Sequence, residues 1–361
     1  MPPRFSSRPD ASLRPVSRPA GPSGGSPSSP HFRVVVLGGG EAGLAVLGSL
    51  SDSALISEVA LVEPSPHHYD QPAWMEVGTE GVAKEQTQSQ QEGRVPPEAT
   101  WLQERVSRVD PEAQVVHLED GTSVHYDYLV VALGTEVHWD RVRGLKDHLG
   151  THGICSVYGY RQAERTWDMV RAFEGGRALF TAPSTPYKGG SAPLRLLFRA
   201  ETVWRETGVR ARTELVFATA ASADAANAEY ADLIERSDRQ EDIHVFPGYD
   251  LIEVRPDSQE AVFRVTKGRS QSQDVQRFDF LHVVPPMRPP ALLEESDLAH
   301  RDGPLKGYLE VRPESLRHHR FETVFGVGDV LGLEGVKTGE RAREQAAEVA
   351  RLLRGAADAE D

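Results

Sequence analysis

The sequence predicts an α/β fold with two doubly wound, Rossmann-like domains, the first of them discontinuous along the chain. Three observations support this prediction. An apolar run at 32–37 ends in spaced glycines and is followed by an Ala/Leu-rich segment with helical periodicity. A second series of apolar runs and helical patterns begins near residue 160, and another short apolar run at 323–327 precedes a last helix.

The stretch FRVVVLGGGEAG, residues 32–43, is typical of a strand, a tight turn and a helix. Its glycines Gly38, Gly40 and Gly43 have the G-x-G-x-x-G spacing of a dinucleotide-binding turn. Such a turn leaves backbone N–H groups at a helix N-terminus, where a pyrophosphate can bind because no Cβ blocks it and the dipole favours its charge. The apolar run VALV follows and ends in Glu63, 20 residues after Gly43, where an acid accepts hydrogen bonds from a ribose 2′-hydroxyl. A carboxylate repels a 2′-phosphate, so FAD or NAD is favoured over NADP.

The segment between this unit and the next is predicted to contain a loop and a meander. His67, His68 and Tyr69 are expected in a loop, with the histidines at the surface, and the polar, Gln-rich segment Thr79–Glu98 is predicted to be a flexible surface loop. Residues 101–137 alternate as a β-meander does, and YDYLVVALG within them indicates a buried strand.

The second α/β unit lacks a glycine turn. RALFTAP and TELVFATA are predicted to be parallel strands, with helices expected at Arg161–Phe173, Ala192–Thr207 and Asp224–Ser237. A second G-x-G-x-x-G would follow the first of these strands, but Ala182–Lys188 reads APSTPYK, and its prolines cannot make that turn. A nicotinamide dinucleotide is therefore not expected there. The segments IHVFPG, LIEVRP, EAVFRVT and FDFLHVVPP are further predicted strands.

Near the C-terminus, TVFGVGDV is predicted to be a short strand that ends on Gly328 and Asp329, before a helix at Lys337–Leu353. This arrangement suits a flavin, because Asp329 can accept from a ribityl hydroxyl. The predicted domains are a leader at 1–30, an FAD-binding domain at 31–148 and 291–355, and a second, degenerate dinucleotide-fold domain at 149–290.

Composition excludes several classes of function. The 361 residues carry a net charge of −14, which argues against nucleic acid as a partner, and no apolar run is long enough to span a membrane. Cys155 is the only cysteine, so no intramolecular disulfide can form, and we expect it to be buried and inert. The pair His318-His319 lacks partner ligands, so no metal is expected. Residues 1–30 contain four arginines and one acid and resemble an organellar transit peptide; a disordered extension is the alternative.

Several blocks together resemble the mitochondrial-type sulfide:quinone oxidoreductases, which are FAD-dependent pyridine nucleotide-disulfide oxidoreductases. These blocks are GGGEAG, VEPSPHHYDQPAWMEVG, YDYLVVALG, LHVVPPMRPP and VFGVGD with the KTGERAREQAA that follows it. The resemblance implies one FAD, with electrons passing from sulfide to flavin to ubiquinone at a membrane surface in mitochondria. In that family two cysteines beside the flavin form a disulfide that hydrosulfide attacks. This chain has Gly189 and Val330 at those positions, so the disulfide relay cannot run.

The resemblance also implies a further C-terminal segment that attaches to the membrane, and we expect that anchor to be missing because the sequence stops at Asp361. Lys337 matches a family lysine and is expected to place a cation near the flavin, with a solvated lysine as the alternative. Two hypotheses stay open: an oxidoreductase with weak or altered sulfide activity, or a catalytically silent FAD-binding paralogue. An NAD(P)H-dependent reductase is disfavoured. The expected cofactor-binding residues are Gly38, Gly39, Gly40, Glu41, Ala42, Gly43, Glu63, Gln71, Ala132, Gly134, Gly328, Asp329 and Lys337.

Overall fold

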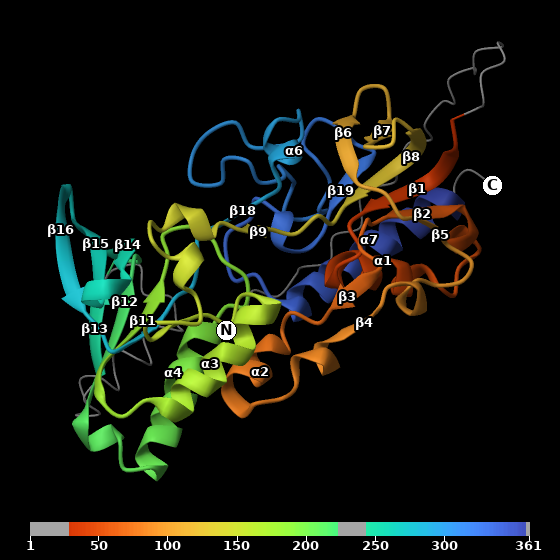
Figure 1. Cartoon of the computed structure of the whole chain (residues 1–361). Coiled ribbons are helices and arrows are strands. Elements are labelled where there is room, and N and C mark those ends of the chain that lie inside the picture. Colours follow the sequence, from red (N-terminus) through yellow and green to blue (C-terminus); the bar gives the residue numbers. More distant parts are fainter. Residues whose placement is uncertain (1–28, 223–242, 359–361) are drawn as a thin grey trace.

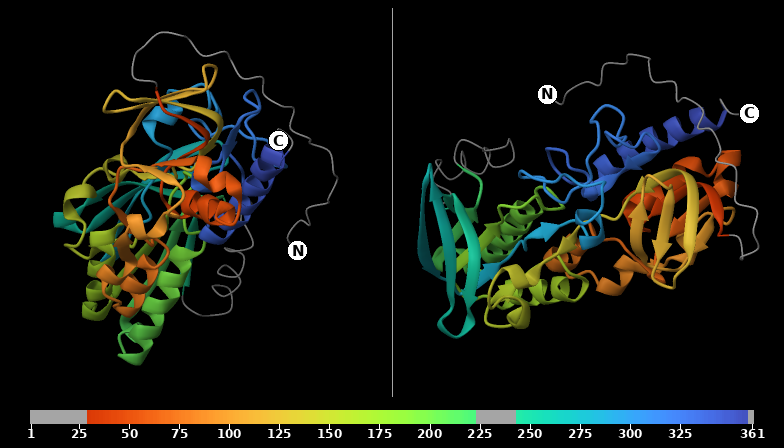
Figure 2. Two further views of the ribbon diagram at one scale, coloured as in Figure 1. Left: turned by 90° about the vertical axis from the view of Figure 1, so that its right-hand side faces the viewer. Right: turned by 90° about the horizontal axis from the view of Figure 1, so that it is seen from above.

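Two β-sheets lie at opposite ends of an elongated molecule, with helices packed against them (Figures 1 and 2). The computed structural model describes residues 29–222 and 243–358. The expected leader at 1–30 falls almost entirely outside these residues, and so does the expected helix at Asp224–Ser237. The domain boundaries given above stay a prediction.

The strands and helices of the described part are as follows. The strands of the first sheet are β1 (His31–Leu37), β2 (Val59–Val62), β5 (Thr100–Leu102), β6 (Val106–Asp110), β7 (Val115–Leu118), β8 (Ser123–Val131) and β19 (Val324–Gly326). Those of the second are β10 (Ile154–Cys155), β11 (Gly176–Ala182), β12 (Thr213–Thr219), β13 (Ile243–Pro247) and β17 (Phe280–His282). The smaller sheets contain β3 (His67–Tyr69), β4 (Gln88–Gln90), β9 (Glu136–Val137), β14 (Tyr249–Arg255), β15 (Glu260–Lys267), β16 (Ser270–Arg277) and β18 (Met287–Arg288). The α-helices are α1 (Glu41–Leu50), α2 (Trp74–Glu80), α3 (Tyr160–Ala172), α4 (Ala192–Glu206), α6 (Ala291–Glu294) and α7 (Gly339–Asp358).

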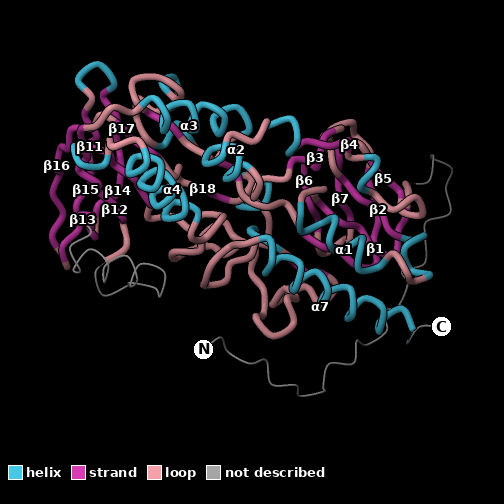
Figure 3. The backbone as a smooth tube through the Cα atoms, turned by 90° about the horizontal axis from the view of Figure 1, so that it is seen from below, coloured by secondary structure: helices cyan, strands magenta, loops and turns pink. Residues whose placement is uncertain are grey.

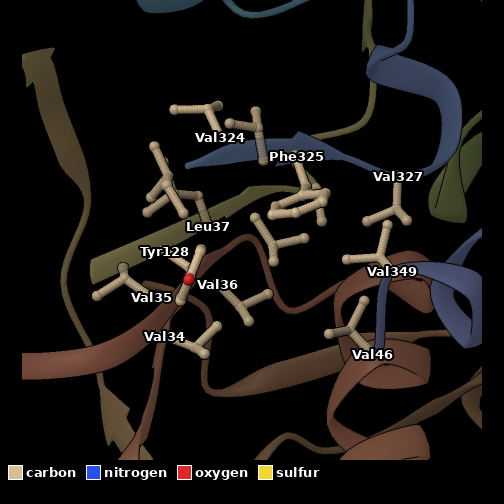
Figure 4. Packing of buried hydrophobic residues seen from close by; sticks show 14 of the residues in the cluster. Val34, Val35, Val36, Leu37, Val46, Tyr128, Val324, Phe325, Val327 and Val349 are labelled. Atoms are coloured by element: carbon tan, nitrogen blue, oxygen red, sulfur yellow. The ribbon is translucent and has the colours of Figure 1, made fainter. Parts of the chain in front are cut away.

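The first sheet combines a parallel core with the predicted antiparallel meander. Its order is β5-β2-β1-β8-β7-β6, and β19 pairs in parallel with β8. β1 lies between β2 and β8, and its residues 34–37 are fully buried because α1 and α7 pack together beside the sheet. Figure 4 shows Val46 of α1 and Val349 of α7 meeting at this core. The chain therefore returns to the first sheet through β19 and α7, as predicted.

The second sheet is wholly parallel, in the order β10-β17-β11-β12-β13. Its helices α3 and α4 cover one face, where Trp204, Phe180 and Phe280 pack against one another. The antiparallel sheet β14-β15-β16 stands at the far end of the molecule (Figure 3). Sequence reasoning missed β16, because its polar residues are mostly exposed and show no apolar alternation.

The prediction of a flexible loop at Thr79–Glu98 is wrong. This segment contains the end of α2, two 3₁₀ turns and β4, which pairs antiparallel with β3. Its polar composition misled the prediction, because a short hairpin can be held by backbone hydrogen bonds and a few buried polar contacts without an apolar core of its own. The last helix also differs slightly: α7 begins at Gly339 and extends to Asp358, whereas Lys337–Leu353 was expected.

Candidate functional site: a cofactor cavity at the glycine turn

The three glycines of the turn are required for three different reasons. Gly38 has φ +100°, and a Cβ there would lie 2.6 Å from the carbonyl oxygen of Ala132, which directly follows the neighbouring strand β8. A Cβ at Gly43 would lie 1.9 Å from the carbonyl oxygen of Gly38, so helix and strand can approach only with glycine at this position. A Cβ at Gly40 would meet no atom within 4 Å. Gly40 thus leaves open space, which is what a close-lying pyrophosphate requires.

The N-terminus of α1 faces this space without a side-chain cap. Gly40 is the N-cap residue, and its carbonyl accepts the first helical hydrogen bond from Leu44 N at 3.0 Å. The first N–H groups of any helix lack intrahelical partners, and together with the helix dipole they favour an anion. Glu41 in the first turn is turned to Arg343 of α7, with 2.6 Å between Oε1 and Nε.

Glu63 stands at the end of β2 with its carboxylate already fixed. Its Oε2 accepts from Gly39 N and its Oε1 from Ser65 N, each at 2.8 Å. The Trp101 indole donates to the Glu63 carbonyl at 2.9 Å. A carboxylate offers about four acceptor positions, so two remain for hydroxyl groups. The ribose contact itself stays a prediction.

The glycine turn opens into a cavity of about 720 Å³, a volume ordinary for a cofactor site. Among the expected site residues, three do not line it: Gly39 and Gly43 are buried behind the turn, and Val330 is buried in the core. The remaining expected residues that line the cavity are Gly38, Gly40, Glu41, Ala42, Glu63, Gln71, Ala132, Gly134, Gly189, Gly328, Asp329 and Lys337.

Three charged side chains lie together on the cavity wall: Lys188, Asp329 and Lys337. Burial raises the pKa of Asp329, and both lysines oppose that rise. Burial lowers the pKa of Lys188, an effect that Asp329 partly offsets, and the Lys188 ammonium donates to Gln71 Oε1 at 2.5 Å. The pKa shift of each group therefore favours its neutral form more than water does. Such shifts are common in active sites.

Lys337 is not the solvated lysine of the alternative interpretation. Its side chain is only 7% exposed, and its ammonium donates to the Leu331 carbonyl at 2.8 Å and lies 4.8 Å from the centre of the Tyr308 ring. Burial lowers its pKa to about 8, against the attraction of Asp329 and with help from Arg341. The residue lies beside Asp329 on the cavity, and its contact with the flavin stays a prediction.

The two positions where the resemblance implies cysteines differ in their surroundings. Gly189 lines the cavity, has φ +90° and donates its N–H to the Lys337 carbonyl at 2.8 Å. Val330 is fully buried among the apolar side chains of the first sheet. The predicted burial of Cys155 is confirmed: it is 1% exposed in β10, and burial raises the pKa of its thiol. No thiol therefore lines this cavity.

Two residues behind the turn were misjudged or missed. His68 is 3% exposed and lies in β3, so its expected place in a loop at the surface is wrong; its Nδ1 is 3.3 Å from the Gly39 carbonyl. Gln91 is fully buried and donates to the same oxygen at 3.0 Å. Lys188 was also missed as a site residue, although its place directly before Gly189 in a family-like segment was a usable signal.

Within residues 29–222 and 243–358, no three His, Cys, Asp or Glu side chains gather as a metal-binding group. His318 accepts hydrogen bonds at Nδ1 from the backbone N–H groups of Arg320 and Phe321. Among the same described residues, no helix is both long enough and apolar enough to span a bilayer.

The two sheets, the glycine turn and the cavity define a protein of the two-sheet, dinucleotide-binding class. The family model described as pyridine nucleotide-disulphide oxidoreductase matches residues 32–171. The mitochondrial sulfide:quinone oxidoreductase of Dictyostelium discoideum is 33% identical to this chain, over 87% of this chain and 68% of the relative. That of Mus musculus is 34% identical, over 85% of this chain and 67% of the relative. The chain belongs to the sulfide:quinone oxidoreductase family.

A solved structure shows the same fold at lower identity. The sulfide:quinone oxidoreductase of Aquifex aeolicus superimposes with a TM-score of 0.73 at 19% identity, covering 92% of this chain and 78% of that one. The family's cofactor is FAD. The residues present fit this group, because the open space at Gly40 and the uncapped end of α1 can receive a pyrophosphate and the cavity continues from there to Asp329.

Proposed function

We propose that the chain is an FAD-dependent oxidoreductase that takes two electrons from sulfide, or from another small reductant, and passes them to a quinone without a cysteine relay of its own. With sulfide, the zero-valent sulfur that forms would leave on an external thiol. The observation that carries this proposal is a cavity of cofactor size whose wall holds the charged side chains of Lys188, Asp329 and Lys337. Glycine and valine at the two positions where the resemblance implies cysteines support the lack of a relay. FAD, when bound, supplies the two-electron chemistry.

The residues of the cavity would then divide the work of binding. Gly40 and the N-terminus of α1 would hold the pyrophosphate, and Glu63 the adenosine ribose. Asp329 would accept from a ribityl hydroxyl. We also propose Gln71, Ala132, Gly134 and Gly328 as cofactor contacts, which their place on the cavity wall supports.

The two lysines would handle charge. Lys188 is cationic when protonated and lines the cavity beside Gly189, so it would attract a hydrosulfide anion to the position where relatives place a thiol. Lys337 would hold a positive charge against the cofactor, and its lowered pKa of about 8 lets it release a proton near neutral pH. A protonated lysine has no lone pair and cannot act as a nucleophile toward sulfur. Both proposed roles therefore depend only on the charge and the position of the lysines.

A second candidate function is that of a catalytically silent FAD-binding paralogue with a structural or regulatory role. It is favoured by the lack of any cysteine on the cavity, since the family's sulfur chemistry needs thiolates. For either function we also propose two domains, an FAD-binding domain at 31–148 and 291–355 and a second domain at 149–290. We further propose a mitochondrial location, which the names of the relatives support.

One anaerobic experiment separates the two functions. The FAD-loaded protein is mixed with sulfide and then with a soluble quinone, and the flavin absorbance is followed, with free FAD as the background. Lys188→Met is the test variant and Lys146→Met, an exposed lysine away from the cavity, is the matched control. An oxidoreductase reduces quinone faster than free FAD does and loses this rate in Lys188→Met only. A rate equal to free FAD in all three proteins would establish the silent paralogue.

A further inference from the structure

The Gly39 residue of the glycine turn has both of its backbone polar groups held by side chains from outside the turn. Its N–H donates to Glu63 Oε2 at 2.8 Å. Its carbonyl accepts from Gln91 Nε2 at 3.0 Å, and His68 Nδ1 lies 3.3 Å from the same oxygen. Gln91 and His68 are 0% and 3% exposed, so these contacts are shielded from water. A hydrogen bond is stronger in such a shielded environment than in water.

The position of the Gly39 carbonyl decides where the next N–H points. The described part of the chain has no cis peptide bond, and in a trans peptide the carbonyl and the following N–H point in opposite directions. The carbonyl of Gly39 is drawn to the buried side by Gln91 and His68. The N–H of Gly40 is therefore directed to the other side, where Gly40 is exposed and lines the cavity, and where a Cβ on Gly40 would have no atom within 4 Å.

Gln91 and His68 are themselves fixed by backbone contacts. Gln91 donates its N–H to the Pro66 carbonyl at 2.9 Å, and its own carbonyl accepts from Arg94 N at 2.9 Å. His68 pairs with Ser89 in the hairpin of β3 and β4. The packing around Gly39 is tight, because a Cβ there would lie 2.2 Å from Gln91 Nε2. The backbone on both sides of the contact is thus held in place, and Gln91 Nε2 and His68 Nδ1 lie within hydrogen-bond distance of the same carbonyl oxygen.

We propose that Gln91 and His68 are positioning residues for the cofactor: they hold the Gly39 peptide so that the Gly40 N–H is aimed at the pyrophosphate, and they raise the affinity for FAD without touching it. Neither residue lines the cavity. The inference rests on the proposed pyrophosphate position at Gly40. A donor that is already oriented needs no ordering on binding, which is the physical source of the gain in affinity.

The test measures FAD binding to the apo-protein by the quenching of flavin fluorescence. Gln91→Met keeps an unbranched side chain but removes the donor, and we expect the Kd for FAD to rise about tenfold. Gln90→Met, at the exposed neighbouring position, is the matched control and should leave the Kd unchanged. His68→Phe, with His67→Phe as its control, tests the second donor and keeps the proposal testable where Gln91→Met does not fold.

A third variant gives a signature that a purely structural role would not. In Gln91→Glu the ionised carboxylate faces the Gly39 carbonyl and repels it, whereas the protonated acid can donate to it. We therefore expect its deficit in FAD affinity, relative to the wild type at the same pH, to shrink as the pH is lowered from about 8 to about 5.5. A deficit that does not change with pH would overturn the positioning role.

Gly40→Val separates failure of this inference from failure of the site assignment. Loss of FAD in Gly40→Val together with wild-type affinity in Gln91→Met and His68→Phe would overturn the positioning role alone. Wild-type affinity in Gly40→Val as well would show that the pyrophosphate does not lie at this turn.

Discussion

Lys337 allows a prediction whose size follows from the structure. Its pKa of about 8, against an ordinary value of 10.5, means that the folded protein disfavours the protonated amine. At about 1.4 kcal/mol for each pH unit of difference, the buried charge costs the folded state about 3 kcal/mol near pH 7. Replacing the lysine by methionine removes this cost but leaves the Leu331 carbonyl without its donor, which costs about 1 kcal/mol. We therefore expect Lys337→Met to raise the free energy of unfolding of the apo-protein by about 2 kcal/mol at pH 7.

The gain should disappear at alkaline pH. Between pH 8 and pH 10.5 the unfolded chain binds more protons at this lysine than the folded chain does, so the stability of the wild type rises with pH across that window. At about pH 9.5 most of the cost is gone, and the variant and the wild type should have nearly equal stability. Lys337→Met is therefore expected to raise the free energy of unfolding at pH 7 and to leave it nearly unchanged at pH 9.5.

Urea denaturation of the apo-protein at pH 7 and at pH 9.5, followed by tryptophan fluorescence, measures this difference. Lys267→Met, at an exposed position in β15, is the control and should change stability by less than about 0.5 kcal/mol at either pH. A loss of stability in Lys337→Met at pH 7, or a gain that is the same at both pH values, would refute the reasoning. FAD retention by the same variant should fall even where its stability rises, because the substitution removes the cation that we propose beside the cofactor.

Three further predictions concern the turn, the second sheet and the cysteine positions. Gly40→Val should fold, because no protein atom lies within 4 Å of its Cβ. It should lose at least nine-tenths of its FAD, read from the ratio of flavin to protein absorbance, because the side chain would fill the space proposed for the pyrophosphate. Gly43→Val should instead fail to fold, since its Cβ would lie 1.9 Å from the Gly38 carbonyl oxygen. NADH should bleach the flavin at well below about 10 per second in stopped flow, and faster bleaching would show that the second sheet binds a nicotinamide. Gly189→Cys combined with Val330→Cys should form no disulfide and should leave the rate of sulfide-dependent quinone reduction at the wild-type value, because the Val330 side chain packs in the core. Thiol titration that finds both thiols oxidised would contradict this.

The sequence predicted those parts of the fold and the site that depend on local pattern. The glycine spacing after β1, the acid at the end of β2 and the Gly-Asp pair after β19 are each readable within a few residues, and each lies on the cavity. The missing glycine turn of the second sheet was readable in the same way. There, residues 183–191 separate β11 from α4, whereas only residues 38–40 separate β1 from α1.

The contacts that sequence reasoning missed join residues far apart in the chain. Gln91 reaches Gly39 across 52 positions, and in the sequence it is one more glutamine in a polar segment. His68 was assigned to the surface because the segment 67–69 was expected to form a loop, and the pair His67-His68 carries no local sign of burial. Lys188 owes its altered pKa to burial and to Asp329, a residue 141 positions later, so no local pattern could reveal it. Burial and long-range charge are properties of the folded chain.

The charged wall of the cavity bears on the choice between an active and a silent protein. Lys188, Asp329 and Lys337 are all held by burial closer to neutrality than they are in water, and buried charges of this kind can often be replaced by apolar side chains without loss of stability. Burying these charged groups costs free energy of folding. A protein that only binds FAD would need only those buried charges that contact the cofactor. Lys188 is the informative member, because it lines the cavity directly before Gly189, one of the two positions where the resemblance implies a cysteine. If its removal leaves FAD binding intact but slows quinone reduction by sulfide, the site acts on a soluble sulfur species; if it alters FAD binding alone, the silent paralogue is the better account.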